Sequence, residues 1–147
     1  MSIKENIDVD LKNAMRAREK EKLGTLRLIT AAIKQIEVDE RIIVDDARLL
    51  LILDKMLKQR KESIAQFEAA QRHDLVQQEQ FELEIIKHYL PEPLSEEAIL
   101  KLIDEAMVST NAEKMSDMGK VMNHIKPHVQ GRADMSQISA LIKTRLH

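Results

Sequence analysis

The stretch DLVQQEQFELEIIKHYLP, residues 74–91, decides how the first part of the chain folds. At about 100° per residue, its apolar side chains fall on one face of a helix. That face is formed by Leu75, Leu83, Ile86, Tyr89 and Leu90. Glu79 and Glu82 lie inside the same face, where an unpaired charge is costly. The pattern therefore predicts a cationic partner on the element that covers this helix.

The preceding helix carries the matching cation. Its apolar face is formed by Leu50, Leu53, Leu57, Ile64 and Phe67. Arg60 lies near the middle of that face. Folding the two helices back on each other about Gln71 brings Arg60 opposite Glu82, and the same register brings Ser63 opposite Glu79. We therefore predict a helical hairpin whose register is fixed by a buried Arg60–Glu82 contact.

The composition favours helices throughout. The 147-residue chain is long enough for one ordinary domain or two small ones. Three glycines, three prolines and 2% aromatic residues leave little turn chemistry for a sheet, so we predict an all-α fold. The formal net charge of −2 argues against strong nonspecific binding to nucleic acids, because neutralising phosphates requires an excess of bases. Any RNA or DNA binding must therefore depend on a local patch.

The absence of cysteine excludes disulfides, thiolate nucleophiles and cysteine metal sites. The first residues, MSIKENIDVDLK, mix acids and bases and lack the apolar core of a signal peptide. The longest apolar run covers residues 49–53, far short of a membrane span. We therefore expect a soluble cytoplasmic protein that makes no contact with a membrane.

Two helices are expected before residue 45. The first fades in the charged run of residues 16–22. Gly24 and Thr25 then break the chain and start the second helix, with the Thr25 hydroxyl as its N-cap. The buried face of the second helix is formed by Leu26, Ile29, Ile33 and Ile36.

A proline-rich link divides the chain. The third helix is expected to begin at residues 45–46, and the fourth to end at Leu90. The sequence PEPLSEE, residues 91–97, then stops a helix and stiffens an extended segment. We predict an N-terminal four-helix subdomain, residues 1–91, followed by a small three-helix tail subdomain, residues 92–147.

Local signals place the three helices of the tail. Ser95 is expected to cap the first and Ser116 the second, whose end is limited by Pro127. Gly131 marks a turn, and Asp134 caps the last helix in the manner of a capping box.

The tail separates its charges along the chain. Residues 91–113 contain six acids and one base, whereas residues 114–147 contain two acids and six bases. These bases are Lys114, Lys120, Lys126, Arg132, Lys143 and Arg145. Such an excess can steer an anionic partner at low salt, although two solvated helix faces that happen to be basic would give the same pattern. A second cluster, Lys55, Lys58 and Lys61, is interpreted as a solvated face.

Other combinations of residues do not predict a cofactor or a metal. His124 and His128 are four residues apart, but Pro127 interrupts their helix and no third ligand is evident. Gly119 and Lys120 resemble the end of a phosphate loop, yet the other glycine and the preceding strand are missing. We therefore predict neither a metal site nor a nucleotide cofactor.

Glu79 and Glu82 are also the only pair that suggests acid–base chemistry. Their expected partner Arg60, and the lack of a sheet that could form a pocket, favour a structural ion pair instead. No serine lies in a strand–turn–helix elbow. We therefore predict no catalytic residue.

Several short motifs follow one another along nearly the whole chain. In order, they are Leu26-Arg27, Lys58-Gln59-Arg60-Lys61-Glu62-Ser63, Phe67, Arg72-His73-Asp74-Leu75, Glu79, Glu82, Tyr89-Leu90-Pro91, Met118-Gly119-Lys120-Val121-Met122 and Gly131-Arg132-Ala133-Asp134. Together they resemble the YqeY-like (GatB/YqeY) family. This family shares its two helical subdomains with the C-terminal region of the B subunit of the tRNA-dependent amidotransferase, which amidates mischarged tRNA with glutamine as donor.

The resemblance implies binding without catalysis. In the amidotransferase the tail contacts tRNA, while the kinase-like chemistry and the hydrolysis of glutamine lie in parts that this chain does not resemble. Any label as a carbon–nitrogen ligase with glutamine as amido-N-donor would therefore come by homology.

The same resemblance suggests where RNA would bind. Gly119 and Lys120 match the small-residue–lysine step at the start of the tail's middle helix, where Gly119 allows close approach of the backbone. The alternative for Gly119 is close packing of two helices. The expected RNA-binding residues are Gly119, Lys120, Lys126, Arg132 and Lys143. The chain is poor in aromatic residues, so recognition would be of backbone and shape rather than by base stacking.

Three hypotheses for function follow. The leading one is a noncatalytic accessory protein that binds tRNA or another structured RNA through the basic face of the tail. The second is a protein-interaction module that docks on a synthetase or an amidotransferase in tRNA aminoacylation or amidation. The third is an amidotransferase-like enzyme, for which the sequence offers no catalytic residue.

Overall fold

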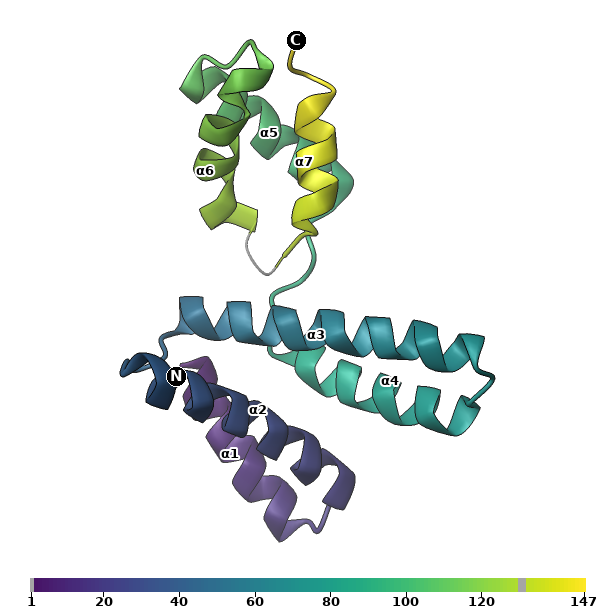
Figure 1. The fold of residues 1–147 in the computed structure, drawn as a ribbon. Coiled ribbons are helices and arrows are strands. Elements are labelled where there is room, and N and C mark those ends of the chain that lie inside the picture. The colour runs from purple at the N-terminus through teal and green to yellow at the C-terminus, as the bar shows by residue number, and fades with distance from the viewer. Residues whose placement is uncertain (1, 130–131) are drawn as a thin grey trace. The chain divides into compact units, whose positions relative to one another are not determined.

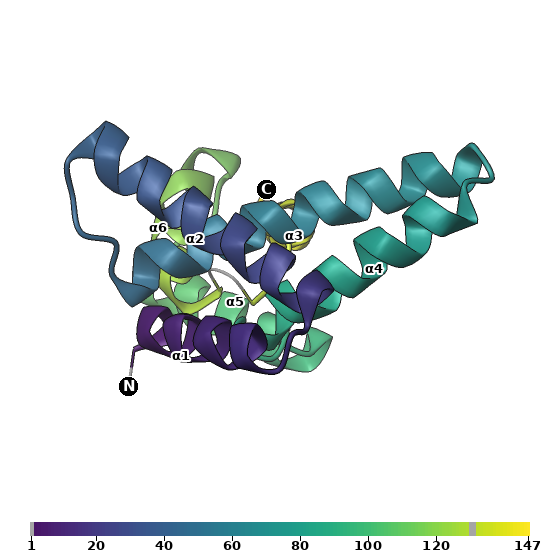
Figure 2. The ribbon, with the colours of Figure 1, turned by 90° about the horizontal axis from the view of Figure 1, so that it is seen from below.

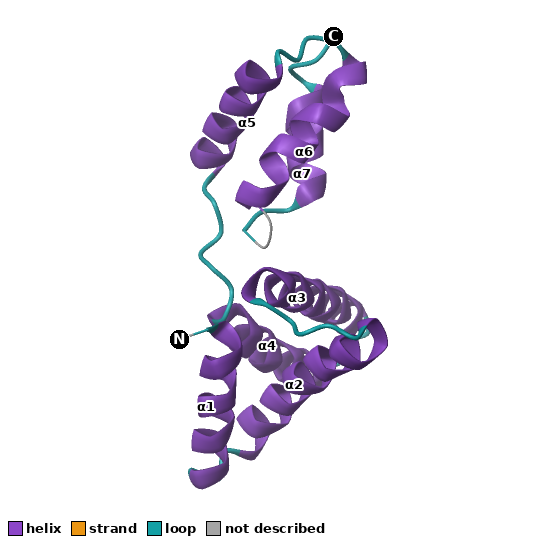
Figure 3. Ribbon diagram, turned by 90° about the vertical axis from the view of Figure 1, so that its left-hand side faces the viewer, coloured by secondary structure: helices purple, strands orange, loops and turns teal. Residues whose placement is uncertain are grey.

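The computed structural model describes residues 2–129 and 132–147. Within these residues the chain forms seven α-helices and one short 3-10 helix, with no strand, so the all-α prediction is confirmed (Figure 1, Figure 3). The chain divides into two compact units, Met1–Leu90 and Pro91–His147. None of the described helices is long and apolar enough to cross a membrane.

The first unit consists of two antiparallel helix pairs. Its helices are α1 (Ile3–Arg16), α2 (Lys20–Glu40), α3 (Asp46–Ala69) and α4 (His73–His88). Helices α3 and α4 lie side by side and form a long hairpin (Figure 2). The turn between them places Gln71 in the left-handed region, with φ of 57°, which reverses the chain in a few residues. Helix α3 begins at Asp46, as expected, and Asp45 caps it through a 2.8 Å hydrogen bond from the Arg48 amide.

The break between α1 and α2 comes earlier than predicted. Gly24 and Thr25 lie inside α2, and the Thr25 hydroxyl donates to the Glu21 carbonyl 3.1 Å away instead of capping a helix. The chain turns at residues 17–19, where Arg18 adopts a left-handed conformation with φ of 58°. The Thr25 N-cap prediction is therefore wrong, because a helix tolerates an interior glycine when tertiary packing supports it.

The predicted apolar face of α3 is only partly correct. The buried residues of α3 are Leu49, Ile52, Leu53 and Met56. Of the predicted set only Leu53 is among them, while Ile64 and Phe67 are half-buried. The first half of α3 belongs to the core of the unit, whereas within the first unit the second half runs beside α4 (Figure 2). A single face drawn along the whole helix does not describe these two environments.

Arg60 lies between the two glutamates of α4. Its Nε donates to Glu82 Oε2 at 2.7 Å and lies 3.5 Å from Glu79 Oε2. The side chains of Arg60, Glu79 and Glu82 are 16%, 21% and 15% exposed, so all three are largely removed from water. The ion pair predicted from helix periodicity is thus present in the structure.

One guanidinium serves two carboxylates, and Glu79 is the worse satisfied of the two. Its Oε2 is buried and accepts no hydrogen bond from the described residues. Burial raises the pKa of Glu79 above its ordinary value of 4.5, and the charge of Glu82 raises it further, while Arg60 opposes both.

Tyr89, directly after α4, links the end of this helix to α1. Its hydroxyl donates to the Asp10 carboxylate of α1, and its ring meets His88 edge to face. Burial, followed by this hydrogen bond, raises the pKa of the Tyr89 hydroxyl. The helix itself ends at His88, two residues before the predicted Leu90.

The second unit packs three helices around an aliphatic core. They are α5 (Glu96–Thr110), α6 (Met118–Val129) and α7 (Met135–Lys143), with the 3-10 helix η1 (Met115–Asp117) before α6. Fully buried residues of this core include Ile103, Ala106, Val121, Ile125, Val129, Ile138 and Ile142. The Ser95 and Asp134 caps are confirmed, with side-chain oxygens 3.1 Å from the Ala98 amide and 2.9 Å from the Ser136 amide. Asp134 accepts from the second residue of α7, so the predicted capping-box arrangement is not confirmed.

Two sequence signals around α6 were misinterpreted. Ser116 lies inside η1 and does not cap α6; the adjacent Asp117 instead accepts hydrogen bonds from the amides of Glu113 and Lys114, both at 3.1 Å. Pro127 does not end α6, which continues to Val129. A proline in the last turn of an exposed helix loses only one backbone hydrogen bond, and water can satisfy the freed carbonyl. The turn predicted at Gly131 lies outside the described residues.

Replacing Arg60 by alanine should destabilise the first unit strongly. We expect Arg60→Ala to lower the free energy of unfolding by about 3–5 kcal/mol, because two largely buried carboxylates lose the cation that they share. Chemical denaturation followed by circular dichroism measures the change. The exposed neighbour Lys61 provides the control, and Lys61→Ala should change stability by less than about 0.5 kcal/mol. A loss below about 1 kcal/mol for Arg60→Ala would mean that the pair behaves like an exposed one.

Glu79 should make stability depend on pH. Because its pKa is higher in the folded than in the unfolded chain, the folded state binds more protons, and stability falls as pH rises from 4.5 through the raised value. Glu79→Gln removes this group, so the variant should be more stable than the parent at neutral pH. Below the ordinary pKa the advantage should vanish. Thermal melts across this pH range test it, and an equal gap at every pH would contradict the pKa assignment.

Candidate functional site

The exposed face of α6 is the main basic surface of the second unit. Val121, Ile125 and Val129 face the core. The exposed residues between them are Asn123, His124, Lys126, Pro127 and His128. Neither α6 nor α7 contains an acidic residue. The face therefore presents lysines and histidines to solvent with no carboxylate from its own helix.

The predicted RNA-binding residues do not form one cluster. Lys120 and Lys126 are both exposed on α6 but are separated by six residues, which is about 9 Å along the axis and about 120° around it. Helices α6 and α7 run in opposite directions (Figure 1). Lys143, in the last turn of α7, is therefore near the Lys120 end, and Arg132, which precedes α7, is near the Lys126 end.

Part of the positive charge is already paired within the unit. Arg145 makes an ion pair with Asp104 of α5, and Lys120 Nζ lies 3.7 Å from Asp117 Oδ1. Hydrogen bonds from two backbone amides lower the pKa of Asp117, with a smaller contribution from Lys120. An exposed pair of this kind is worth only about 0–1 kcal/mol, so Lys120 can exchange Asp117 for another anion.

Arg132 has a structural task. Its Nε donates to the Glu92 carbonyl at 3.3 Å, and its own carbonyl accepts from the Leu94 amide at 2.8 Å. These two bonds hold the segment before α5 against the segment before α7. Replacing Arg132 would therefore disturb the fold of the second unit as well as its charge.

Gly119 is open to solvent. A methyl group added at this position would meet no atom within 4 Å. The interpretation that Gly119 allows close packing of two helices is therefore wrong. The glycine leaves the backbone of the first turn of α6 accessible.

The two histidines of α6 lie on one helix but do not form a metal site with other residues. Their ring centroids, in His124 and His128, are 6.3 Å apart. Among the described residues, no group of three or more His, Cys, Asp or Glu side chains is placed to hold a metal ion.

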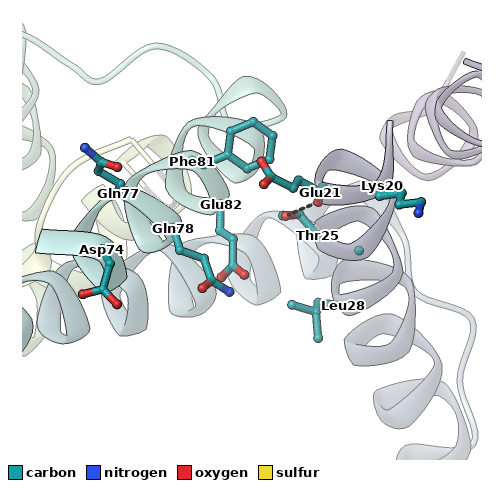
Figure 4. A pocket seen from close by; sticks show the side chains of 10 residues that line it. Lys20, Glu21, Thr25, Leu28, Asp74, Gln77, Gln78, Phe81 and Glu82 are labelled. Carbon is teal, nitrogen blue, oxygen red and sulfur yellow. Dashed lines mark hydrogen bonds between the residues drawn. The ribbon is translucent and has the colours of Figure 1, made fainter. Parts of the chain in front are cut away.

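A groove in the first unit was not predicted from the sequence. It lies between α2 and α4, and its volume is about 740 Å3 (Figure 4). The α2 wall is formed by Lys20, Glu21, Gly24, Thr25 and Leu28. The α4 wall is formed by Asp74, Gln77, Gln78, Phe81 and Glu82. Each set follows the spacing of one helical face, so the groove is a space between two helix surfaces.

The groove combines apolar and acidic side chains. Leu28 is 46% exposed and Phe81 is 40% exposed. Phe81 is one of only two phenylalanines in the chain, so its exposure is notable. Three carboxylates, those of Glu21, Asp74 and Glu82, stand against the single amine of Lys20. A signal for this site was present in the sequence, because Phe81 is an aromatic residue on the polar face of its helix.

Comparison with known proteins identifies the family. A family profile described as Yqey-like protein matches residues 4–146, which is nearly the whole chain. The chain belongs to the Yqey-like protein family. The resemblance drawn from the sequence motifs is thereby confirmed.

Several curated fungal proteins are similar to this Yqey-like chain. The protein named altered inheritance of mitochondria protein 41, mitochondrial, from Pyrenophora tritici-repentis is 34% identical over 140 residues, covering 93% of this chain and 77% of that protein. Its namesake from Lachancea thermotolerans is 33% identical over 144 residues, with the same coverage. The Saccharomyces cerevisiae protein of this name is 36% identical over 123 residues, covering 79% of this chain and 66% of that protein.

These relatives correct the expected location. A cytoplasmic protein was expected from the sequence, whereas the relatives are named as mitochondrial proteins. The cytoplasmic expectation is therefore wrong. It rested on the absence of an apolar leader, which is not evidence for one compartment over another.

Filling the space at Gly24 should stabilise this Yqey-like chain. A methyl group at Gly24 meets no atom within 4 Å, and glycine inside a helix costs roughly 0.5–1 kcal/mol relative to alanine. We expect Gly24→Ala to raise the free energy of unfolding by about that amount in urea denaturation. Ala31, exposed on the same helix, offers the reverse control, since Ala31→Gly should lower it by a similar amount. A destabilised Gly24→Ala variant would show that the position is already crowded.

Proposed function

We propose that this Yqey-like chain is a noncatalytic accessory protein that binds tRNA or another structured RNA through its second unit. The observation that carries the proposal is the exposed face of α6, which offers Lys120 and Lys126 and has no acidic residue, followed by α7, which has none either. Such a surface attracts phosphate because neither helix carries a carboxylate of its own, and the neighbouring Asp117 makes only a weak, exposed pair with Lys120.

The spacing of the bases supports contact with a nucleic-acid backbone rather than with a single phosphate. Lys120 and Lys143 lie toward one end of the α6–α7 pair and Lys126 toward the other, so they suit successive phosphates along a strand. Gly119 leaves the start of α6 open for close approach of one such phosphate. The second unit contains no phenylalanine, tyrosine or tryptophan, so the proposed recognition uses backbone and shape and not base stacking.

The basic side chains of the second unit would bind RNA, and no residue of the chain is given a catalytic role. Arg145 is left out because Asp104 already pairs with it, and Arg132 contributes charge while holding the segment before α5. Because the fungal relatives are named as mitochondrial, mitochondrial tRNA is the first RNA to test beside total tRNA.

Charge reversal on the second unit should weaken RNA binding and its salt dependence together. We expect the triple variant Lys120→Glu, Lys126→Glu and Lys143→Glu to bind tRNA much more weakly than the parent. The slope of log affinity against log salt should become less steep by about 2, because each phosphate contact contributes about 0.7–0.9. Fluorescence anisotropy with labelled tRNA at several salt concentrations measures both quantities.

Two further variants make the test specific. The matched control reverses Lys55, Lys58 and Lys61 on α3, a basic cluster interpreted as a solvated face, and should retain most of the affinity. Gly119→Ala should keep the fold, since nothing lies near the added methyl, but should reduce affinity if the backbone approaches a phosphate. Equal losses from both triple variants would indicate nonspecific attraction, and unchanged binding in the α6–α7 triple would remove the proposal.

A further inference from the structure

We propose that the groove between α2 and α4 is a docking site for a basic amphipathic helix of a partner protein. The site is independent of the proposed RNA surface, because all ten of its lining residues belong to the first unit. An RNA strand is a poor occupant of this groove, since three carboxylates line it.

The shape of the groove suits a helix. On α4 the lining residues run from Asp74 to Glu82 at positions that share one face, which spans about two helical turns or about 12 Å. On α2 the lining residues run from Lys20 to Leu28 over the same length. Two helical walls of matched length form the kind of groove into which an amphipathic helix lays its apolar face.

Exposed apolar side chains supply the anchors for such a helix. Phe81 projects from α4 and Leu28 from α2, and both remain 40% or more exposed when the unit is folded (Figure 4). Phe81 also borders two smaller depressions, beside Tyr89 and beside residues 18–22, so apolar surface continues past the end of the groove. An exposed aromatic ring at the meeting point of several hollows is a typical interaction hot spot.

Gly24 contributes no side chain to the α2 wall of the groove. Its backbone is helical and nothing would meet an added methyl group, so no packing need explains a residue that weakens the N-terminal part of α2. The next residue, Thr25, lines the groove and turns its hydroxyl back to the Glu21 carbonyl (Figure 4). The space at Gly24 is available to a side chain of the occupant.

The charges select a basic occupant. Glu21 makes no ion pair among the described residues, whereas Glu82 already accepts a 2.7 Å hydrogen bond from Arg60. Asp74 is paired with Arg72 at 3.1 Å, but both side chains are more than half exposed and the pair is weak. Lysine or arginine side chains beside an apolar stripe would meet Glu21 and compete with Arg72 for Asp74, while the stripe covers Phe81 and Leu28.

A synthetic peptide tests the proposal on the full-length chain. The probe is a fluorescent helix of about four turns with leucine on one face and lysine on the other, and its counterpart carries glutamate in place of lysine. We expect the lysine peptide to bind, measured by fluorescence polarisation, and the glutamate peptide to bind at least about tenfold more weakly. Equal binding of both peptides would overturn the proposed charge selectivity.

Groove variants locate the binding. Phe81→Ala and Glu21→Lys should each weaken the lysine peptide by about tenfold or more, as hot-spot residues do. Val38→Ser and Glu68→Lys are the matched controls, because both residues are exposed and neither lines the groove; they should leave binding unchanged. Circular dichroism verifies that all four variants fold. Loss of binding in the controls, or none in the groove variants, would overturn the assignment.

Other occupants give distinct results. If sedimentation shows a dimer that Phe81→Ala dissociates, the groove holds a second copy of the chain and the partner proposal is wrong. If tRNA displaces the lysine peptide from the parent and from the α6–α7 charge-reversal triple alike, RNA occupies the groove and the proposal is also wrong. Failure of the RNA proposal alone leaves the peptide result unaffected, because the two sets of variants lie on different units.

Discussion

The contact of Arg60 with Glu79 and Glu82 is the constraint on which the first unit depends. Leucine and isoleucine would hold α3 against α4 in several registers, because apolar contacts are not directional. A single guanidinium that must meet two largely buried carboxylates permits only one of those registers. The same contact also affects the groove, because Glu82 is one of the lining residues and its carboxylate accepts the hydrogen bond from Arg60. The position of the candidate docking surface thus follows from an ion pair inside the hairpin.

The two units present surfaces of opposite character. In the second unit the acids are concentrated in and around α5, where Asp104 takes up Arg145, and the bases of α6 and α7 remain exposed. In the first unit the groove has the reverse sign, with one lysine among three carboxylates. Anionic and cationic partners would therefore sort between the units without competing for one site. A chain with a net charge near zero can do this only by segregating its charges.

Helix periodicity and local capping signals predicted one contact between two helices and two helix starts. The Arg60–Glu82 contact was predictable because both residues interrupt long apolar faces, and Ser95 and Asp134 act through their own first turns. The break at Arg18 was missed because an arginine in the left-handed conformation has no sequence signature. Gly24 followed by Thr25 looks like a helix break and an N-cap, although both residues lie inside α2. The α2–α4 groove depends on how two helices separate in space, which no single-helix pattern contains. Phe81 on a polar face was the available clue.

Tyr89 has a practical consequence. The chain has one tyrosine and no tryptophan, and both phenylalanines also precede residue 91. Near-ultraviolet spectra therefore report on the first unit alone, and the hydrogen bond to Asp10 makes the tyrosine emission sensitive to whether α1 is docked. The second unit is silent at these wavelengths. Comparing tyrosine fluorescence with far-ultraviolet ellipticity along one denaturation curve would separate the unfolding of the two units without any label.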